Sequence, residues 1–521
     1  MNNRTILTGL LGAGTVASAT AQTPAKTKAQ TPQGRPNIVI IYTDDMGIGD
    51  LSCTSTGWIE TPAIDRLASQ GLVLNSYYTS APVSSPSRVG LTTGMFPMEW
   101  GINTYLQSRK GNAACEQADY LTAAAPSMAR ILRDAGYATG HFGKWHMGGG
   151  RDVKDAPSIP SFGFDEYCST WESPDPAPEL TATNWIWSDK DDVKRWNRTG
   201  YFVDKTLDFL VRHKDKPCFV NLWPDDMHTP WVPDEESQHK QKDWNSQPNF
   251  SEVLAEYDRQ IGRFLTQLDQ LGLSDNTIVI FTSEQGYSFP FGKWTCYDEG
   301  LQTGFIVRWP GVVKPGTTTD AMCEYVDVTP TLTDIAGGKT PEGLDGRSFL
   351  PVIRGKAKSF KQEVYAIQTS RGIHAGPEHY GIRSVRSDRF AYILNLTPEA
   401  TFKCMSTHPK RDWWASWKEK AATDEFARGQ VDRYQHRPGE ELYDIVNDPF
   451  QTRNLADDPR YAAEKAALRT KLLQWMERQG DKGQQTEMEA KEHMFHKEAA
   501  DTPRAKKKKT GKARPQNARN N

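Results

Sequence analysis

The fold class of this chain is decided by the stretch Pro36-Asn37-Ile38-Val39-Ile40-Ile41-Tyr42-Thr43-Asp44-Asp45. Residues 37–43 form a mostly apolar run between a proline and two carboxylates, which is typical of a strand buried on both faces. Adjacent carboxylates repel each other unless a cation neutralises them, and a hard divalent ion is the simplest such cation. The alternative is an Asp that caps the following loop or helix.

Strand and helix patterns alternate on the C-terminal side of this run. They predict strands over residues 72–78, from 137–140 onward, and over 218–223, 277–282 and 303–309, with helices over 62–70, 121–135 and 250–271. This alternation predicts an α/β fold, a large α/β sandwich with a mostly parallel central sheet. Sites in such sheets lie beyond the carboxyl ends of the strands.

The pattern changes near residue 361. Short strand patterns then follow over residues 364–368, 380–386, 389–396 and 440–445, and one helix pattern follows over residues 459–480. They predict a smaller C-terminal α+β domain with an antiparallel sheet. We therefore expect a signal peptide (1–21), a linker (22–34), a large N-terminal domain (35–360), a C-terminal subdomain (361–485) and a basic disordered tail (486–521).

The N-terminus has the pattern of a bacterial-type signal peptide. Arg4 gives the positive start, residues 6–18 a mostly apolar run, and Ala19-Thr20-Ala21 the cleavage site. We therefore expect an exported protein, periplasmic or secreted, and a short N-terminal helix is the alternative. No membrane span is predicted, because no segment reaches about 18 apolar residues.

Charge and cysteine content argue against several classes of protein. The net charge of −2 gives the whole chain no attraction to nucleic acid or membranes. The tail around Lys506–Lys509 is interpreted as a solvated segment, with a tether to a polyanion as the alternative. Seven cysteines without a Cys-x-x-Cys pair indicate neither a zinc cluster nor a redox motif. The sequence leaves the oligomeric state open.

Two further segments are candidates for a chemical site, and the two adjacent donors of the second suit an oxyanion. The first is Ser84-Ser85-Pro86-Ser87-Arg88-Val89-Gly90-Leu91-Thr92-Thr93-Gly94, although a helix with proline in its first turn would also explain it. The second spans residues 136–148. There Lys144 and His146 alternate along a segment expected to be extended, so both can face one side. A glycine-rich turn with an incidental basic pair is the alternative.

Two further candidates follow predicted strands. Glu284 and Gln285 end the strand predicted over residues 277–282, where a carboxylate and an amide oxygen would complete a calcium-type oxygen shell. His228 follows the strand predicted over residues 218–223. A single His before a turn is usually structural, so His228 gains weight only together with the other candidates.

These motifs carry a family resemblance from about residue 36 to residue 476. The chain resembles a type I sulfatase of the alkaline phosphatase superfamily, the formylglycine-dependent enzymes, and is of the serine type. The matching segments follow in order: the first strand with its acid pair, Ser84–Gly94, Gly136–Gly148, His228-Thr229-Pro230, Arg308–Gly311 and Glu441–Asp444 with Asp448-Pro449.

The resemblance implies a site and a chemistry. Ser84 would be oxidised to formylglycine (3-oxoalanine) by a formylglycine-generating maturase that accepts Ser. One Ca2+ ion would be bound by Asp44, Asp45, Glu284, Gln285 and the modified Ser84. Arg88 and Lys144 would hold the formylglycine hydrate, and His146 would stay near it. His228 and Lys293 would contact the sulfate, and one of them would protonate the leaving group.

The sequence departs from the family pattern at the second acidic motif. Glu284-Gln285 stands where the family usually has Asp-Asn or Asp-His. Because calcium tolerates irregular coordination by 6–8 oxygens, we expect the metal to be retained and the loop to be set back. The usual Gly-x-His stretch before Lys293 is also missing.

Two other functions are alternatives to sulfate hydrolysis. A phosphatase or phosphodiesterase of the same superfamily would need two metals about 4 Å apart and additional His and Asp ligands. With 11 His and a Glu284-Gln285 motif, the chain suits a one-metal site better. A catalytically silent binder of sulfated glycans is the second alternative, and it would result if Ser84 is not converted.

The substrate implied is a sulfated carbohydrate. Residues 289–293 and 380–386 look most like the heparan N-sulfatase (sulfamidase) branch, so a sulfamate or a sulfate ester on a glycosaminoglycan or other polysaccharide is expected. Weaker candidates for substrate binding are Arg371, His374, His408, Lys410 and Arg411, the last three in a Trp-rich insertion over residues 397–437. A hydrophobic patch that packs this insertion onto the domain is the alternative.

Overall fold

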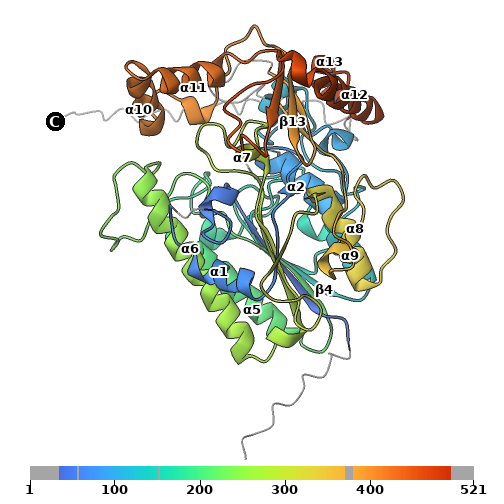
Figure 1. The fold of residues 1–521 in the computed structure, drawn as a ribbon. Helices are drawn as coiled ribbons and strands as arrows, with labels where there is room; N and C mark the ends of the chain where they lie inside the picture. Colours follow the sequence, from blue (N-terminus) through green and yellow to red (C-terminus); the bar gives the residue numbers. More distant parts are fainter. Residues whose placement is uncertain (1–33, 56–57, 151–152, 370–379, 494–521) are drawn as a thin grey trace, which may run out of the picture.

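A mixed eight-stranded sheet forms the centre of the larger of two units (Figure 1). The computed structural model describes residues 34–55, 58–150, 153–369 and 380–493. The strand order is β5-β4-β6-β1-β7-β8-β2-β9. The strands are β1 (Asn37–Thr43), β2 (Leu72–Leu74), β4 (Ala138–Gly143), β5 (Glu166–Ser169), β6 (Cys218–Trp223), β7 (Thr277–Ser283), β8 (Phe305–Arg308) and β9 (Thr317–Thr319).

The sheet is mostly parallel, as the sequence predicted. Strand β8 runs antiparallel to both of its neighbours, β7 and β2, whereas the other pairs of this sheet are parallel. Parallel neighbours need crossover connections, which the helices between the strands supply. The helices of this unit are α1 (Pro62–Ser69), α2 (Ser84–Thr93), α3 (Arg109–Cys115), α4 (Met128–Asp134), α5 (Arg198–Arg212), α6 (Gln247–Gln270), α7 (Asp298–Leu301), α8 (Val328–Ala336) and α9 (Leu350–Ile353).

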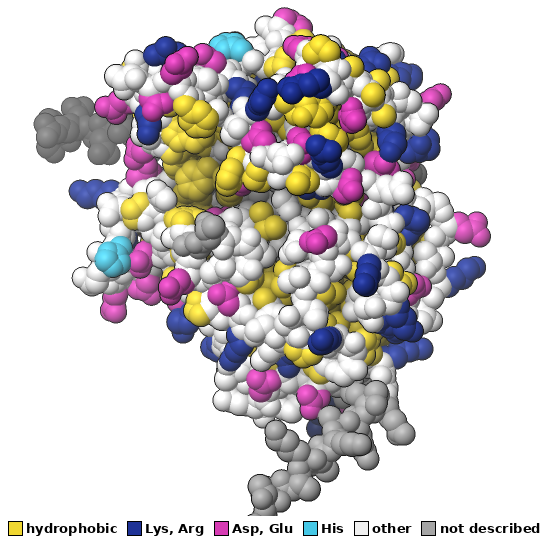
Figure 2. All heavy atoms as spheres, in the orientation of Figure 1, with side chains coloured by type: hydrophobic (Ala, Val, Ile, Leu, Met, Phe, Trp, Pro, Cys, Tyr) yellow, Lys and Arg dark blue, Asp and Glu magenta, His cyan; other side chains and the backbone are white. Residues whose placement is uncertain are grey.

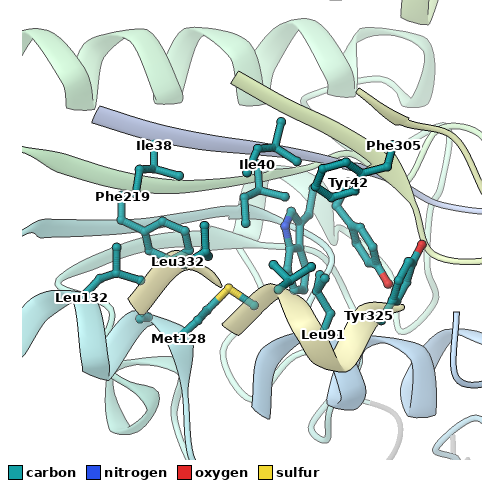
Figure 3. Close-up of a cluster of buried hydrophobic side chains, with 14 of the residues drawn as sticks. Ile38, Ile40, Tyr42, Leu91, Met128, Leu132, Phe219, Phe305, Tyr325 and Leu332 are labelled. Carbon is teal, nitrogen blue, oxygen red and sulfur yellow. The ribbon is translucent and has the colours of Figure 1, made fainter. Parts of the chain in front are cut away.

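Helices cover both faces of the sheet because β1 is apolar on both sides. Ile38, Ile40 and Tyr42 pack on one face with residues of α2, α4 and α8, as Figure 3 shows. Val39 and Ile41 pack on the other face with α1, α5 and α6. Each fully buried aliphatic side chain of this kind stabilises the fold by about 1.5–3 kcal/mol.

The second unit is an antiparallel sheet in the order β11-β12-β13-β14, as predicted. Its strands are β11 (Val364–Gln368), β12 (Ile382–Arg386), β13 (Phe390–Asn395) and β14 (Glu440–Asp444). Leu472 and Trp475 of α12 (Ala462–Arg478) pack on one face. The insertion forms α10 (Asp412–Ala421) and α11 (Glu425–Gln435), which pack toward the other face, and α13 (Gln484–Met488) follows α12.

The two units share hydrophobic clusters. Phe96 and Val326 of the larger unit pack with Trp475 and Leu442 of the smaller one. Hydrophobic side chains also gather in the band below α10 and α11, where the units meet (Figure 2). The small sheet is therefore fixed against the loops at one edge of the large sheet.

Two predicted elements are wrong in extent. The strand predicted over residues 72–78 is divided, because β2 pairs in the large sheet whereas β3 (Tyr77–Tyr78) leaves it to pair with β10 (Cys323–Glu324). The helix predicted over residues 121–135 begins only at Met128. Pro126 disfavours helical backbone in the residue before it, so residues 121–127 form turns instead. The two helices of the insertion had no strong sequence signal.

The cysteines, the surface charge and the helix lengths bear on the other predictions from the sequence. All seven cysteines are free thiols. Acidic and basic side chains are interspersed on the face shown in Figure 2. Within residues 34–493 as described, no helix is long and apolar enough to cross a membrane.

The burial of β1 predicts a large effect of truncating Ile40, which is 0 % exposed. We expect Ile40→Ala to destabilise the protein by about 2–5 kcal/mol, because it removes core contacts and leaves a cavity. Thermal melting measures the loss as a lower midpoint. Val211→Ala, at a position that is 44 % exposed, is the control and should melt like the wild type. Equal melting of both variants would contradict the central place of β1.

Candidate active site

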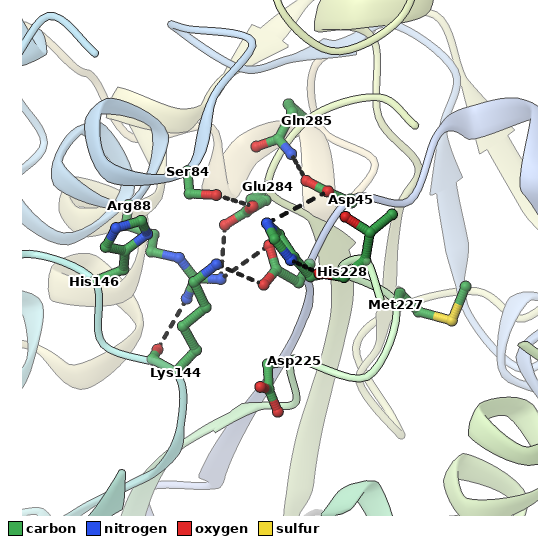
Figure 4. Close-up of polar contacts among 12 residues, drawn as sticks. Asp45, Ser84, Arg88, Lys144, His146, Asp225, Met227, His228, Glu284 and Gln285 are labelled. Carbon is green, nitrogen blue, oxygen red and sulfur yellow. Dashed lines mark hydrogen bonds and ion pairs between the residues drawn. The ribbon is translucent and has the colours of Figure 1, made fainter. Parts of the chain in front are cut away.

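Four adjacent parallel strands bring the candidate residues to one edge of the large sheet. The strands lie in the order β4-β6-β1-β7, so their carboxyl ends meet there. The residues that follow them are Lys144 after β4, His228 after β6, Asp44 and Asp45 after β1, and Glu284 and Gln285 after β7. Helix α2 starts at the same edge and adds Ser84 and Arg88, as Figure 4 shows.

The turn after β4 requires glycine. Gly143 has a φ of 131°, and a Cβ atom there would lie 2.0 Å from the carbonyl oxygen of Trp223. Lys144 donates its backbone N–H to that same oxygen at 2.9 Å. The Lys144 side chain then reaches Asp44, with Nζ 2.7 Å from Oδ2.

Asp44, Asp45 and Glu284 converge in a buried acidic cluster. One oxygen of each lies within 4.8 Å of one oxygen of the other two. Their exposed fractions are 0, 1 and 0 %. Three carboxylates so close together and so little solvated require positive charge beside them.

Each carboxylate of the cluster has a cationic partner. Arg88 Nη2 lies 2.6 Å from Glu284 Oε2, and Lys293 Nζ lies 2.6 Å from Asp45 Oδ1. Lys144 serves Asp44. The Arg88 guanidinium is itself held by a hydrogen bond of 2.9 Å from Nη1 to the carbonyl of Lys144. Its central carbon lies 5.2 Å from the centre of the Tyr42 ring.

The pKa values of two carboxylates of the cluster are shifted in opposite directions. Burial raises the pKa of Glu284 to about 8, assisted by the nearby Asp44 carboxylate and opposed by Arg88. Burial would also raise the pKa of Asp44, but Lys144 and the hydrogen bond with Glu284 hold it well below its ordinary value. A divalent cation bound beside these carboxylates would favour the ionised form of Glu284.

The donor atoms of the cluster fit a hard divalent cation. Asp44 Oδ1 and Gln285 Oε1 are buried and have no hydrogen-bond partner among the described residues. Gln285 instead donates through Nε2 to Asp45 Oδ1. Carboxylate and amide oxygens are the ligands that calcium and magnesium prefer. The cluster can therefore hold a metal ion, with Asp44, Asp45, Glu284 and Gln285 as its protein ligands.

Ser84 is the first residue of α2 and faces this cluster. Val83 before it is extended, and the Ser84 hydroxyl donates to Glu284 Oε1 at 2.5 Å. The next turn is anchored by Ser87, whose hydroxyl donates to the Glu284 carbonyl and lies 2.7 Å from Thr79 Oγ1. Glu284 thus binds the hydroxyl of residue 84 through one carboxylate oxygen and the Arg88 guanidinium through the other.

His228 and Lys293 lie at the Asp45 side of the cluster. His228 Nε2 is 3.9 Å from Asp45 Oδ2. Burial lowers the pKa of His228 to about 4, although Asp45 acts to raise it. The neutral ring carries its proton on Nδ1, because Nδ1 lies 2.5 Å from the Thr229 carbonyl, which can only accept. Nε2 is therefore the ring atom available toward the site.

His146 lies at the site, but not by the backbone that was predicted. The segment is not extended there, because His146 has a φ of 49°. Its N–H donates to the Glu172 carbonyl at 2.8 Å, and its Nε2 lies 3.3 Å from the Leu106 carbonyl. The ring stands beside Arg88 in Figure 4. The turn, rather than strand alternation, brings His146 and Lys144 to the same site.

Sequence comparison agrees with this geometry. Residues 36–338 match the model of the family described as Sulfatase, which is more than half of the chain. The chain belongs to the sulfatase family. Residues 284–402 also match the model described as N-sulphoglucosamine sulphohydrolase, C-terminal. The protein is thus a sulfuric ester hydrolase, as its acidic cluster and Ser84 motif predicted.

Characterised relatives of this sulfatase cover most of the chain. An ulvan-active sulfatase from Formosa agariphila is 28 % identical over 461 residues, 87 % of this chain and 82 % of that protein. An N-acetylgalactosamine-6-O-sulfatase from Bacteroides thetaiotaomicron is 29 % identical over 423 residues, 64 % of this chain and 79 % of its own.

Solved structures share the fold. One, described under the metabolism of multiple glycosaminoglycans by Bacteroides thetaiotaomicron, has a TM-score of 0.63 and 25 % identity, and covers 85 % of this chain and 99 % of that one. Another, in complex with its substrate D-glucosamine-2-N,6-O-disulfate, has a TM-score of 0.62 at 20 % identity and covers 86 % of this chain and 99 % of that one.

The sulfatase site opens into a pocket of about 370 Å3. Asp45, His228 and Lys293 line its base, and Arg411 and Trp413 of the insertion line it as well. Of the weaker substrate-binding candidates, Arg411 alone among the described residues lines this pocket. His408 and Lys410 do not, and Lys410 is exposed to solvent. Arg371 and His374 lie outside the described residues.

The Trp-rich insertion both packs onto the domain and lines the pocket. Trp414 is 2 % exposed and packs with Tyr434 in the core of the small unit. Trp413 is half-buried and lines the pocket. One tryptophan therefore packs the insertion, and its neighbour faces the site.

Sequence reasoning missed the residues that support His228. Arg195, 2 % exposed, donates through Nη2 to the carbonyls of Asp225 at 2.7 Å and His228 at 2.9 Å. Its Nη1 and that of Arg198 both bind Asp225 Oδ2, at 2.5 and 2.9 Å. Glu172, buried and lining the pocket, was missed too. No local motif marks these residues, since each acts across a long stretch of chain.

A two-metal phosphatase or phosphodiesterase would need a second cluster of metal ligands. Asp44, Asp45 and Glu284 form the single group of three or more His, Cys, Asp or Glu side chains within metal-binding distance, counting the described residues. Asp225, another buried acid near the site, is bound by Arg195 and Arg198.

Glu284→Ala should lower the affinity for Ca2+ and Mg2+ roughly tenfold or more, because it removes one oxygen ligand from the cluster. Isothermal titration of metal-free protein with each ion measures this. Glu342→Ala, at an exposed loop position, is the matched control and should bind as the wild type does. Unchanged affinity, or an unchanged response of activity to a chelator, would exclude Glu284 from the metal ligands.

Arg195→Lys should lower kcat about tenfold and leave KM nearly unchanged, because lysine keeps the charge but cannot make the paired bonds that fix the His228 carbonyl. Steady-state kinetics on a sulfated sugar measure the two parameters separately. The exposed Arg259→Lys is the control. If Arg195→Lys lowered only the melting temperature, Arg195 would be structural and would not position His228.

Proposed function

We propose that this sulfatase hydrolyses a sulfate ester or a sulfamate on a carbohydrate and releases inorganic sulfate. A glycosaminoglycan or another sulfated polysaccharide fragment is the proposed source. The names of the relatives support this, since they refer to ulvan and to N-acetylgalactosamine-6-sulfate. The sulfoglucosamine-type match of residues 284–402 supports an amino sugar as one candidate.

The observation that carries the proposal is the position of the Ser84 hydroxyl. It binds Glu284 of a buried acidic cluster, and the other oxygen of that carboxylate binds the Arg88 guanidinium. A serine hydroxyl in ordinary surroundings is a weak nucleophile, and it needs nearby charge to ionise. This position suits a nucleophile at residue 84, in its formylglycine form.

The cofactor proposed is one Ca2+ ion, bound by Asp44, Asp45, Glu284, Gln285 and residue 84. The ion would lower the energy needed to ionise a hydroxyl of hydrated residue 84, whose second hydroxyl allows sulfate to leave without attack by water. The longer side chains Glu284 and Gln285 suit the larger, more flexible shell of Ca2+ better than the strict octahedron of Mg2+.

The protein's own residues would supply the remaining steps. Arg88 and Lys144 lie on the side of Asp44 and Glu284, where they stabilise negative charge on the oxygen of residue 84 as it attacks sulfur. Lys293 lies on the Asp45 side, next to the pocket, where it can bind a sulfate oxygen. His146, whose ring stands beside Arg88, would stay near the formylglycine hydrate.

The leaving oxygen or nitrogen needs a proton, which His228 or Lys293 would give. His228 is neutral in the free protein, so Nε2 must first take up a proton before it can donate one. A bound sulfate anion would favour that proton, because it adds negative charge next to the ring. Lys293 Nζ has N–H groups beyond the one that binds Asp45, and can donate directly.

Maturation and export belong to the same proposal. A maturase that accepts Ser would convert Ser84, and the segment 1–21 would direct the protein to the periplasm or the outside of the cell. The region 35–360 would carry the catalytic site and 361–485 the smaller subdomain, with 486–521 as a basic tail. Without conversion of Ser84, the same pocket would only bind sulfated glycans.

Ser84→Ala should abolish sulfate release, by at least 1,000-fold, and leave the melting temperature within a few degrees of the wild type, because it removes the nucleophile but no core contact. Sulfate release from defined sulfated mono- and disaccharides measures the activity. Intact mass of the wild type is the companion measurement, since conversion of Ser84 lowers it by about 2 Da.

The result has clear alternatives. Retained activity in Ser84→Ala would remove the nucleophile assignment. A wild type with no mass loss, no sulfate release and intact sugar binding would identify a silent binder instead.

A further inference from the structure

Arg411 is a cation that the sulfate chemistry does not use. The charged residues at the base of the pocket, Lys293 and Asp45, bind each other at 2.6 Å. Arg411 lines the same pocket, but it comes from the start of the insertion, next to α10. It makes no ion pair with a carboxylate in the part of the chain that the structure describes.

The surroundings of Arg411 favour binding of an anion. Its guanidinium carbon lies 5.2 Å from the centre of the Trp413 ring, so one face rests on an aromatic surface. Burial lowers the pKa of Arg411, and Asp243 counteracts this from a distance without forming an ion pair. A half-buried guanidinium without a carboxylate partner has unused N–H donors, which fit a carboxylate or a sulfate in two parallel bonds.

Two tryptophans line the pocket together with this cation. Trp185 lines the pocket with 51 % of its surface exposed, far more than an aromatic side chain that only packs a core. Trp413 is fixed in place, because its Nε1 donates to the Ser406 carbonyl at 2.9 Å and its ring packs 4.8 Å from that of Phe289. Flat aromatic faces of this kind suit the apolar face of a sugar ring.

We propose that Trp185, Arg411 and Trp413 form a subsite for a second acidic group of the substrate. The acidic group is a carboxylate or a second sulfate, carried by the sugar that bears the scissile sulfate or by its neighbour. Arg411 binds the anion and the tryptophans contact the sugar rings. This inference rests on the proposed function, because it places the scissile sulfate at Lys293 and His228 in the base of the same pocket.

A substrate without a second acidic group would leave the Arg411 guanidinium without an anionic partner. When a substrate covers the pocket, Arg411 loses water on its open side, and a charge without a partner is then costly to bury. An anion on the substrate restores the lost interactions. The pocket volume of about 370 Å3 lies near the lower end of the roughly 300–1,000 Å3 typical of ligand sites, so a small charged saccharide suits it.

The test compares pairs of saccharides that differ by one acidic group. Both pairs contain the same sulfated sugar. The members of the first pair differ by a second sulfate, and those of the second pair differ by a neighbouring uronate. We expect the wild type to prefer one doubly charged member by about tenfold or more in kcat/KM. Arg411→Gln should lower kcat/KM for that member roughly 10- to 100-fold and leave the singly charged one within about twofold. Arg411→Lys should recover part of the loss.

A binding assay makes the test independent of turnover. Titration of the doubly charged saccharide into Ser84→Ala protein, with and without Arg411→Gln, should give the same loss of affinity. Lys420→Gln removes an exposed cation from α10 outside the pocket, and it should change neither readout.

The outcomes separate this subsite from the proposed function. Sulfate release without any preference for a second acidic group would overturn the subsite and leave the function standing. The subsite would also be wrong if Arg411→Gln weakened both members of a pair equally, or if Lys420→Gln had the same effect. No sulfate release from any saccharide by enzyme converted at Ser84 would instead overturn the proposed function, and binding to Ser84→Ala protein would then decide the subsite alone.

Discussion

The structure depends on the balance of charge around three buried carboxylates. Asp44, Asp45 and Glu284 face Arg88, Lys144 and Lys293, so the free site pairs three acids with three cations. Buried ion pairs contribute little net stability, because the desolvation of both partners offsets their attraction. Their presence here is therefore better explained by function. A divalent ion added to this balanced set makes the site net positive, which is the charge that an anionic sulfate group needs.

The parallel sheet makes this concentration of charge possible. Four neighbouring strands end at one edge, and each contributes charged or polar side chains within one to five residues of its last residue. The strands themselves are apolar and fully buried, so the acids stand at the boundary between the core and the pocket. Regular backbone pairing continues into the site, since Glu284 donates its N–H to the Thr43 carbonyl at 2.9 Å. The rigidity of β1 and β7 thus extends to the first residues of the cluster.

The sequence predicted those parts of the fold and site that are local in the chain. The apolar run of β1, the acid pair behind it and the start of α2 at Ser84 are visible in a few consecutive residues, and they carry the larger share of the site. Residues that act at a distance were not predictable in this way. Arg195 supports a carbonyl 33 positions away, and its sequence surroundings resemble any exposed turn. The backbone of His146 was predicted wrongly. A residue other than glycine rarely adopts a positive φ, and at His146 this conformation depends on tertiary contacts such as the hydrogen bond with Glu172.

The loop after β7 joins the chemistry to the substrate pocket. Ser288 donates its hydroxyl to Asp45 Oδ2 at 2.7 Å, and its carbonyl accepts a hydrogen bond of 2.8 Å from Ser406 of the insertion. One residue therefore links an acidic ligand of the cluster to the segment that carries Arg411 and Trp413. The Ser406 carbonyl also accepts a hydrogen bond from Trp413 Nε1, so a short chain of hydrogen bonds joins Trp413 to the acidic cluster. The position of Trp413 at the pocket and that of Asp45 in the cluster are therefore fixed by the same set of hydrogen bonds.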